Sequence, residues 1–198
     1  MKKFLIISAF LVMVLASNAN SQSLTTLSYS MGLATGDMGD YVSNFSGRGF
    51  TLDYRKMVQP NVGVGFYSGW NVFYDEKPFD TYTIDNRSLS GKQFRTVNSV
   101  PLMFATDYYL KPGEDFNPYV GLGVGTIYTE RATDMGIYRL TQDAWSFAFT
   151  PQIGFMYSVN RYAGISVSAK YNMGLAAGDF DTTQSYLSFN IGYVFMGN

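Results

Sequence analysis

The chain has 198 residues and a formal net charge of −1, so it is long enough for one domain and lacks the basic excess of nucleic-acid-binding proteins. Aromatic residues make up 17% of it and charged residues only 15%, well below the roughly 25% charged residues of soluble domains. Cysteine and histidine are both absent, which excludes disulfides, thiol nucleophiles, Cys/His zinc sites and a cysteine-linked lipid anchor. We therefore expect a protein whose outer surface does not all face water.

The first 19 residues have the pattern of a secretory signal peptide. Two lysines precede an apolar run over residues 4–16, and small residues at positions 17 and 19 provide a cleavage site before Asn20. The run is shorter than the roughly 20 apolar residues that a membrane helix needs. We predict a cleaved signal peptide over 1–19 and a β-barrel domain over 20–198.

Beyond residue 20, apolar and polar residues alternate with period two, which predicts β-strands with one apolar face. The clearest segment is the last, where Leu187, Phe189 and Ile191 share one face and Ser188 and Asn190 share the other. The alternating segments lie at 24–35, 48–56, 62–73, 97–110, 118–128, 146–157, 165–173 and 187–195. The sequence therefore predicts an all-β, eight-stranded antiparallel up-and-down barrel.

The predicted connections alternate between short and long. Short links are expected at 57–61, 111–117 and 160–163, and long polar links at 36–47, 74–95, 129–143 and 177–185. Short turns at one end and long loops at the other are typical of transmembrane barrels, whose termini and short turns lie in the periplasm. We predict location in the cell outer membrane, with periplasmic termini and extracellular loops.

The two faces of the strands indicate which side of the barrel meets lipid. A soluble barrel would have the polar face outward, and alternation alone does not distinguish the two arrangements. The polar face is rich in Gly, Ser and Ala, which suit a narrow lumen, and it carries Asp53, Arg55, Asp107 and Lys170. We expect these four residues to pair in the lumen as a charge network, with the apolar face turned toward lipid.

Aromatic residues gather near the predicted strand ends, as two interfacial girdles would require. The girdle residues are predicted to be Tyr54, Tyr108, Tyr109, Tyr119, Tyr157, Tyr193 and Phe195 at one end and Trp70, Tyr128, Trp145 and Tyr171 at the other.

The strand count, Val100-Pro101-Leu102, the glycine-alternating segment Pro118–Gly125 and the aromatic final strand resemble small outer-membrane β-barrels of the OmpX and OmpA-barrel type. The resemblance covers the whole chain after residue 20. It implies a transmembrane barrel fold, an outer-membrane location and insertion by the barrel assembly machinery. It implies no particular activity, because one fold carries many functions.

The long link over 74–95 is the strongest candidate for binding a surface ligand, because of its length and aromatic content. Its candidate binding residues are Phe73, Tyr74, Phe79, Tyr82 and Phe94.

A short sequence repeat occurs at the ends of the first and seventh predicted strands. The segment Tyr29–Asp37 recurs as Tyr171–Asp179 with seven of nine positions identical. The simpler interpretation is a shared strand-end turn in which Gly-Asp reverses the chain. The alternative is a paired rim site that uses Asp37 and Asp179.

Catalytic and metal sites are poorly supported. Without histidine, an enzyme would need an acid pair such as Asp134 with Asp143, and solvated loop charges are the simpler interpretation. Most acidic residues lie in the predicted outer links, where a divalent cation could bridge them to lipopolysaccharide phosphates, but none has the regular spacing of a calcium loop. We expect no catalytic residues, no resident metal and no cofactor.

These observations favour a non-enzymatic outer-membrane barrel with a role in envelope integrity or in surface-loop binding and adhesion. The alternatives are a passive small-solute pore and a histidine-independent outer-membrane enzyme. Side chains about fill an eight-stranded barrel, which argues against the pore. The expected partners are outer-membrane lipid and lipopolysaccharide, the assembly machinery during biogenesis and a surface ligand, with no role for nucleic acid.

Overall fold

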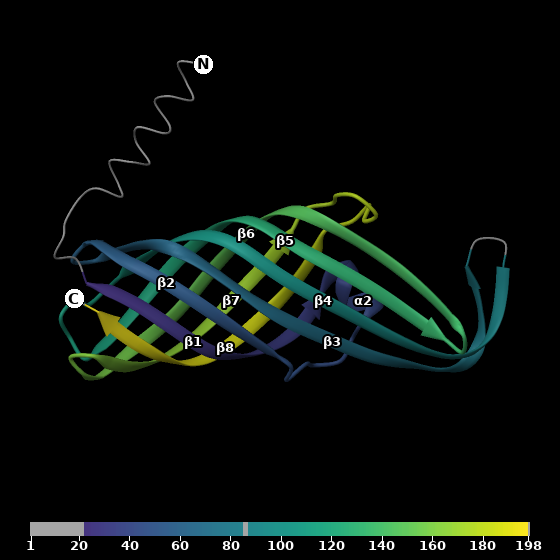
Figure 1. Cartoon of the computed structure of the whole chain (residues 1–198), viewed down its shortest axis with the longest axis horizontal. Coiled ribbons are helices and arrows are strands. Elements are labelled where there is room, and N and C mark those ends of the chain that lie inside the picture. The colour runs from purple at the N-terminus through teal and green to yellow at the C-terminus, as the bar shows by residue number, and fades with distance from the viewer. Residues whose placement is uncertain (1–21, 85–86, 198) are drawn as a thin grey trace, which may run out of the picture.

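The computed structural model describes residues 22–84 and 87–197, and it confirms the predicted barrel (Figure 1). Eight antiparallel strands pair in sequence order, and β1 closes the ring against β8 from Ser23↔Gly197 to Thr35↔Ser185. The strands are β1 (Ser23–Thr35), β2 (Gly49–Gln59), β3 (Val62–Ile84), β4 (Arg87–Tyr109), β5 (Phe116–Met135), β6 (Tyr138–Asn160), β7 (Ala163–Gly174) and β8 (Gln184–Gly197). The predicted signal peptide over 1–19 lies outside the described residues.

The two ends of the barrel differ, as the link lengths predicted. The start of β1 and the end of β8 share one end with the short β2–β3, β4–β5 and β6–β7 turns, and the long hairpins project from the other (Figure 1). We call these the terminal end and the hairpin end.

Two predicted long links are corrected by the structure, because most of their residues are strand. Pairing of β3 with β4 continues to Ile84↔Arg87, and pairing of β5 with β6 continues to Met135↔Tyr138. The predicted links 74–95 and 129–143 are therefore mainly the ends of two long hairpins. Alternation missed them because a strand that meets water on both faces needs no apolar side.

The predicted orientation of the two faces is confirmed. Phe104, Leu122 and Ile153 point outward and are 74%, 51% and 63% exposed, whereas Ser99 and Thr150 are fully buried in the lumen. Exposed apolar side chains in a continuous band are what a lipid-facing surface requires. We call these outward apolar side chains the lipid-facing band. In water, such a band would be a large patch prone to aggregation.

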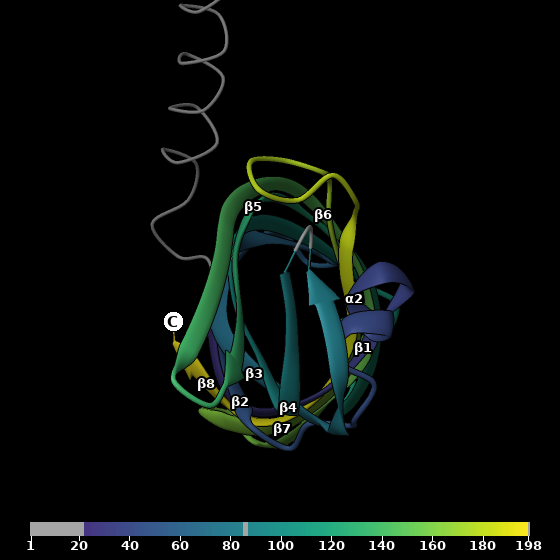
Figure 2. The ribbon, with the colours of Figure 1, turned by 90° about the vertical axis from the view of Figure 1, so that its right-hand side faces the viewer.

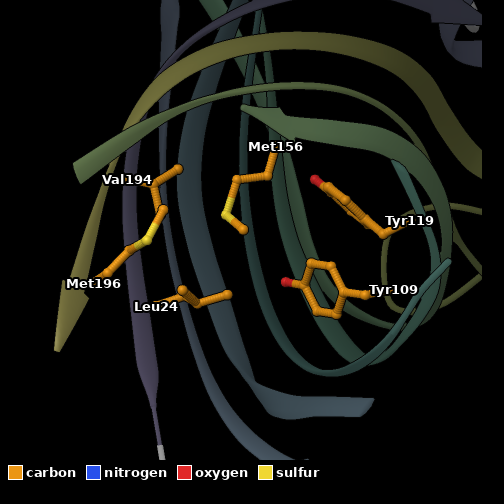
Figure 3. Packing of buried hydrophobic residues seen from close by; sticks show 6 residues of the cluster. All are labelled: Leu24, Tyr109, Tyr119, Met156, Val194 and Met196. Carbon is orange, nitrogen blue, oxygen red and sulfur yellow. The ribbon is translucent and has the colours of Figure 1, made fainter. Parts of the chain in front are cut away.

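Two residues predicted for the aromatic girdle do not belong to it. Tyr109 and Tyr119 are 4% and 9% exposed and point into the lumen at the terminal end, where Figure 3 shows them facing Met156. Tyr108, the neighbour of Tyr109, is 48% exposed and faces outward. Adjacent strand residues point to opposite faces, so Tyr108 and Tyr109 could not both belong to the girdle.

The lumen is filled by apolar clusters at three levels. The terminal cluster is Leu24, Tyr109, Tyr119, Met156, Val194 and Met196 (Figure 3). The middle cluster is Tyr67, Met103, Ala105, Ile127 and Ala148, and the mouth cluster is Ala34, Met38, Val42, Phe73, Val97 and Tyr186.

A short helix, α2 (Gly36–Tyr41), supplies part of the mouth cluster and was not predicted from the sequence. Met38 and Val42 are fully buried, and the Val42 N–H donates to the Met38 carbonyl oxygen at 2.9 Å. Their spacing of four residues places both on one face of a helical turn. No helix in the described part of the chain is long and apolar enough to cross a membrane.

Candidate functional site

The four predicted lumen charges come together in one network in the lumen, next to the terminal cluster. Arg55 Nε donates to Asp107 Oδ2 at 2.7 Å, and Arg55 Nη2 lies 3.4 Å from Asp53 Oδ1. Lys170 Nζ reaches the same Asp53 oxygen at 2.6 Å from the other side of the β1–β8 seam. Two cations thus meet two carboxylates, which leaves the network electrically balanced in a region where an unpaired charge would be costly.

Neighbouring groups complete the network. Arg55 Nη1 donates to the carbonyl oxygens of Tyr54 and Phe66 at 3.0 and 2.9 Å, and the Gln152 amide donates to Asp107. A side chain at Gly121 would collide with the Asp107 carboxylate, so this glycine gives the network its space. The glycine alternation in β5 therefore reflects crowding in the lumen.

A small cavity separates this network from the terminal cluster. Its lining includes Asp53, Arg55 and Asp107 on one side and Tyr109 and Tyr119 on the other. Its volume of about 20 Å³ suffices for a water molecule and not for an organic solute.

A polar layer lies on the mouth side of the network. Tyr67 OH donates to Asn172 Oδ1 at 2.8 Å, and Asn172 Nδ2 donates to Ser188 Oγ at 3.2 Å. Lys170 Nζ lies 4.0 Å from the centroid of the Tyr67 ring, so this tyrosine links the polar layer to the charge network.

The structure moves Phe73 out of the predicted binding loop. Phe73 is fully buried, and its ring packs edge-on against Tyr186 with centroids 5.3 Å apart. The ring also reaches β1, where a Cβ at Gly32 would lie 2.8 Å from it. Phe73 therefore plugs the mouth, because its position two residues after the inward-facing Asn71 points it into the lumen.

The other predicted binding residues lie along the β3–β4 hairpin. Phe79 is 76% exposed, Tyr74 is partly exposed with its hydroxyl on Glu76, and Phe94 is half-buried. Tyr82 OH donates to the Pro78 carbonyl oxygen at 2.6 Å. The residues are thus spread along the hairpin and do not converge on one pocket.

A break in the β3–β4 pairing lies between Lys77 and Asp80 and includes Pro78 and Phe79. Irregularities of this kind bend a strand pair and increase its twist. Beyond it, the hairpin turns across the open end of the ring, as Figure 2 shows from the hairpin end.

An arginine pair that sequence reasoning missed lies in the mouth. The guanidinium carbons of Arg95 (β4) and Arg131 (β5) lie 4.9 and 4.8 Å from the centroid of the Tyr41 ring in α2. Arg131 also lies 5.0 Å from the centroid of Phe180, and its Nη2 donates to Gln184. Arg95 lies two residues before the inward-facing Val97 and therefore points to the same side of the strand. The sequence prediction treated 74–95 as a loop and so did not assign Arg95 to the lumen.

Asp37 and Asp179 occupy equivalent places in the repeat but different surroundings. Both are exposed; Asp37 lies in α2, whereas Asp179 Oδ2 accepts the Asp143 N–H at 3.2 Å beside β6. The shared feature is the preceding glycine: Gly36 and Gly178 both have φ +57°. This favours the interpretation of the repeat as a strand-end turn, since left-handed φ suits glycine.

The fold and the sequence together identify the family. The family model of the OmpW family matches residues 81–188, which is more than half of the chain. The chain belongs to the OmpW family. The predicted resemblance to small outer-membrane barrels is thereby confirmed, and this OmpW-family chain is an outer-membrane β-barrel protein.

Solved structures share the fold at low sequence identity. The attachment invasion locus protein Ail of Yersinia pestis is 11% identical with a TM-score of 0.55, covering 89% of this chain and 99% of Ail. Ail in complex with the heparin analogue sucrose octasulfate gives 13% and 0.53 at the same coverage. The outer-membrane protein OprG of Pseudomonas aeruginosa is 15% identical with a TM-score of 0.54, covering 90% and 96%. No curated protein matches the chain.

The OmpW-family barrel shows no assembled acid pair at the residues that the sequence suggested. Asp134 of β5 lies opposite Arg139 of β6, with its Oδ1 3.7 Å from Arg139 Nε. Asp143 of β6 lies opposite Glu130 of β5, so the two aspartates are four residue pairs apart. Across the described ranges, no group of three or more acidic residues is placed to hold a metal ion.

Proposed function

We propose that this OmpW-family protein is a non-enzymatic outer-membrane barrel that presents its two long hairpins outside the cell as a binding surface. The observation that carries the proposal is that the hairpins continue the barrel sheet well beyond the lipid-facing band, while the lumen beneath them is filled. On this proposal, the lipid-facing band contacts outer-membrane lipid and lipopolysaccharide, and the assembly machinery inserts the chain.

The projecting sheet is built from the ends of β3, β4, β5 and β6. Pairing of β2 with β3 begins at Gly49↔Asn71, whereas pairing of β3 with β4 continues to Ile84↔Arg87. The mouth-side end of β3 thus has β4 on one side and no strand partner on the other in the described chain. A free strand edge can add a strand from a partner, which is one way such a sheet recognises a protein.

The projecting parts of the two hairpins carry exposed apolar side chains beyond the lipid-facing band. Ile137, Phe79 and Tyr138 are 93%, 76% and 59% exposed. Charged pairs stand beside them: Lys92 with Glu76, and Arg139 with Asp134. Aromatic and aliphatic anchors among polar groups are the usual composition of a protein-binding patch.

The proposed orientation follows from the length of the connections. Short turns in outer-membrane barrels lie in the periplasm and long connections outside. The terminal end of this barrel therefore faces the periplasm, and the hairpin end faces the medium. Protease treatment of intact cells would then cut near Phe79 or Ile137 and spare the turn at Gly113.

The test replaces residues 76–92 with Asn-Gly, a two-residue turn that closes hairpins. We expect the shortened barrel to fold, judged by different migration of boiled and unboiled samples, and to lose adhesion of cells to mucin-coated glass. A second variant with Phe79 and Ile137 changed to serine should lose most of the same adhesion. Unchanged adhesion and unchanged permeability of the envelope to a fluorescent dye in both variants would contradict the proposal.

A matched control changes the opposite end of the barrel. Lys111 and Glu114 form an exposed ion pair at 2.9 Å in the β4–β5 turn. Replacing both with glutamine should leave adhesion unchanged, because the pair is predicted to lie in the periplasm. The passive pore is tested separately: the filled lumen predicts no steady single-channel conductance in planar bilayers, and a stable conductance would favour the pore.

A further inference from the structure

The arginine pair in the mouth differs from the cations deeper in the lumen. Arg55 is held by two carboxylates, at 2.7 and 3.4 Å. Neither Arg95 nor Arg131 has a carboxylate within 4.0 Å in the described part of the chain, although both are partly buried. Two guanidinium groups on one tyrosine ring repel each other, and each has lost part of its hydration, so the pair favours a counter-anion.

The hydrogen-bonding capacity of the two guanidinium groups is only partly used. Arg95 donates from Nε to Gln93 Oε1 at 3.0 Å and from Nη1 to the Tyr41 carbonyl oxygen at 3.1 Å. Arg131 donates from Nη2 to Gln184, but its Nε is buried and has no partner. Buried N–H donors are almost always satisfied in native proteins, so this one favours an acceptor that residues 22–84 and 87–197 do not supply.

The electrostatics of Arg131 also favour binding of an anion. Burial lowers the pKa of Arg131, outweighing the opposite effect of Tyr41 and Asp37, and the nearby Arg95 lowers it further. The guanidinium still stays protonated at neutral pH. A bound anion would relieve both the burial and the repulsion.

We propose that Arg95 and Arg131, stacked on Tyr41 in the mouth of the barrel, bind a phosphate or sulfate monoester group that enters from the extracellular side. Phosphate and sulfate monoesters both offer three terminal oxygens to donors on two guanidinium groups. A phosphate monoester also carries about two negative charges at neutral pH, which match two cations, whereas a sulfate monoester carries one. A carboxylate offers two oxygens and one charge. The site does not depend on the hairpin tips and extends beyond the proposed function.

The direction of entry follows from the faces of the strands. Arg95 and Arg131 have the inward parity of the buried residues Val97 and Thr129, whereas Tyr128 lies on the outer face. A lipid headgroup in the surrounding leaflet therefore meets the wrong side of β4 and β5. A soluble or polymer-borne monoester reaches the pair through the mouth.

The experiment titrates the folded barrel in octyl glucoside micelles with glucose 6-phosphate and follows binding by calorimetry at fixed ionic strength. Arg131→Gln and Arg95→Gln should each weaken binding by about tenfold, the loss of one charge-assisted interaction. Sodium sulfate should compete with the sugar phosphate, and sodium chloride at equal ionic strength should not. Undiminished binding by the folded arginine variants would overturn the proposal.

Two further variants keep the test decisive. Asp37→Asn removes a negative charge near Arg131 and should tighten binding about twofold to threefold, a gain that a misfolded variant would not show. Lys92→Gln removes an exposed cation from the outer face of β4 and should leave affinity within about twofold. An equal loss from Lys92→Gln and Arg95→Gln would show general charge attraction and would also overturn the proposal.

The source of the monoester is distinguished in nanodiscs. Phosphatidic acid carries a monoester headgroup, and phosphatidylcholine does not. We expect glucose 6-phosphate to bind equally in nanodiscs of phosphatidylcholine with and without phosphatidic acid. Competition by phosphatidic acid would assign the site to a lipid headgroup and overturn entry from the medium. Binding that persists after replacement of 76–92 would separate this site from the hairpin surface.

Discussion

Asp53 of β2 accepts a hydrogen bond from Lys170 of β7 at 2.6 Å, and the same carboxylate oxygen lies 3.4 Å from Nη2 of Arg55. One carboxylate thus serves two cations, while Asp107 serves one of them at closer range. All four side chains are largely shielded from water, so the stability of the network depends on its balance more than on any single pair.

Removing one charge from this network should cost more than removing an ion pair. Arg55→Met leaves two carboxylates facing Lys170 alone, and we expect a loss of about 3–5 kcal/mol in the free energy of unfolding. Arg55→Met combined with Asp107→Leu keeps the balance and should recover at least half of that loss. Urea unfolding followed by Trp70 and Trp145 fluorescence measures both. A double variant as unstable as the single one would contradict the argument.

Asp75 should make the mouth loop, residues 42–48 between α2 and β2, sensitive to strong acid. Its carboxylate accepts from Ser43 N at 3.1 Å, Ser43 Oγ at 3.0 Å, Asn44 Nδ2 at 2.8 Å and Lys77 Nζ at 2.9 Å. Burial tends to raise the pKa of Asp75, but Lys77 and Ser43 outweigh it and lower the pKa from 3.8 to about 2. The stabilisation is complete above about pH 4 and is lost as the pH falls through 2.

Pepsin cleavage at Phe45, a 58% exposed residue of this loop, reports the effect. The intact protein should become more susceptible between pH 4 and pH 2, after correction for the pH dependence of pepsin itself. Asp75→Asn should be susceptible throughout that range, because it cannot form the ionised tether. Asp80→Asn, an exposed acid on the same strand, is the control and should follow the intact protein. A flat profile for the intact protein would refute the tether.

The two repeat glycines provide a matched pair of backbone tests. Gly36 and Gly178 share φ +57°, so alanine at either should cost about 1 kcal/mol from backbone strain. A Cβ at Gly178 would also lie 2.8 Å from the Cβ of Ala144, whereas the nearest atom at Gly36 is Ser185 Oγ at 3.5 Å. Gly178→Ala should therefore be the more destabilising, and Ala144→Gly should relieve the excess. Equal unfolding midpoints for the two alanine variants would contradict this.

Alternation predicted the barrel because lipid and lumen impose opposite demands on neighbouring residues. It failed where that contrast ends. Past Tyr74, β3 has polar surroundings on both sides, so the hairpin looked like a loop and Arg95 was never assigned to the lumen. The residue type of Tyr109 suits an interfacial girdle, but its parity is opposite to that of the outward-facing Tyr108, so it lies in the lumen. The charge network was recognisable because Asp53, Arg55, Asp107 and Lys170 interrupt the polar, small-residue face of otherwise regular strands.

Asp53 and Lys170 lie 117 residues apart and on opposite sides of the β1–β8 seam. Their contact cannot form until the first strand has met the last. An open, partly inserted sheet would leave Lys170 without its only carboxylate partner, at a cost of several kcal/mol, whereas Asp53 and Asp107 would keep Arg55. The filled lumen thus acts on biogenesis: it penalises arrested intermediates and makes ring closure nearly all-or-none.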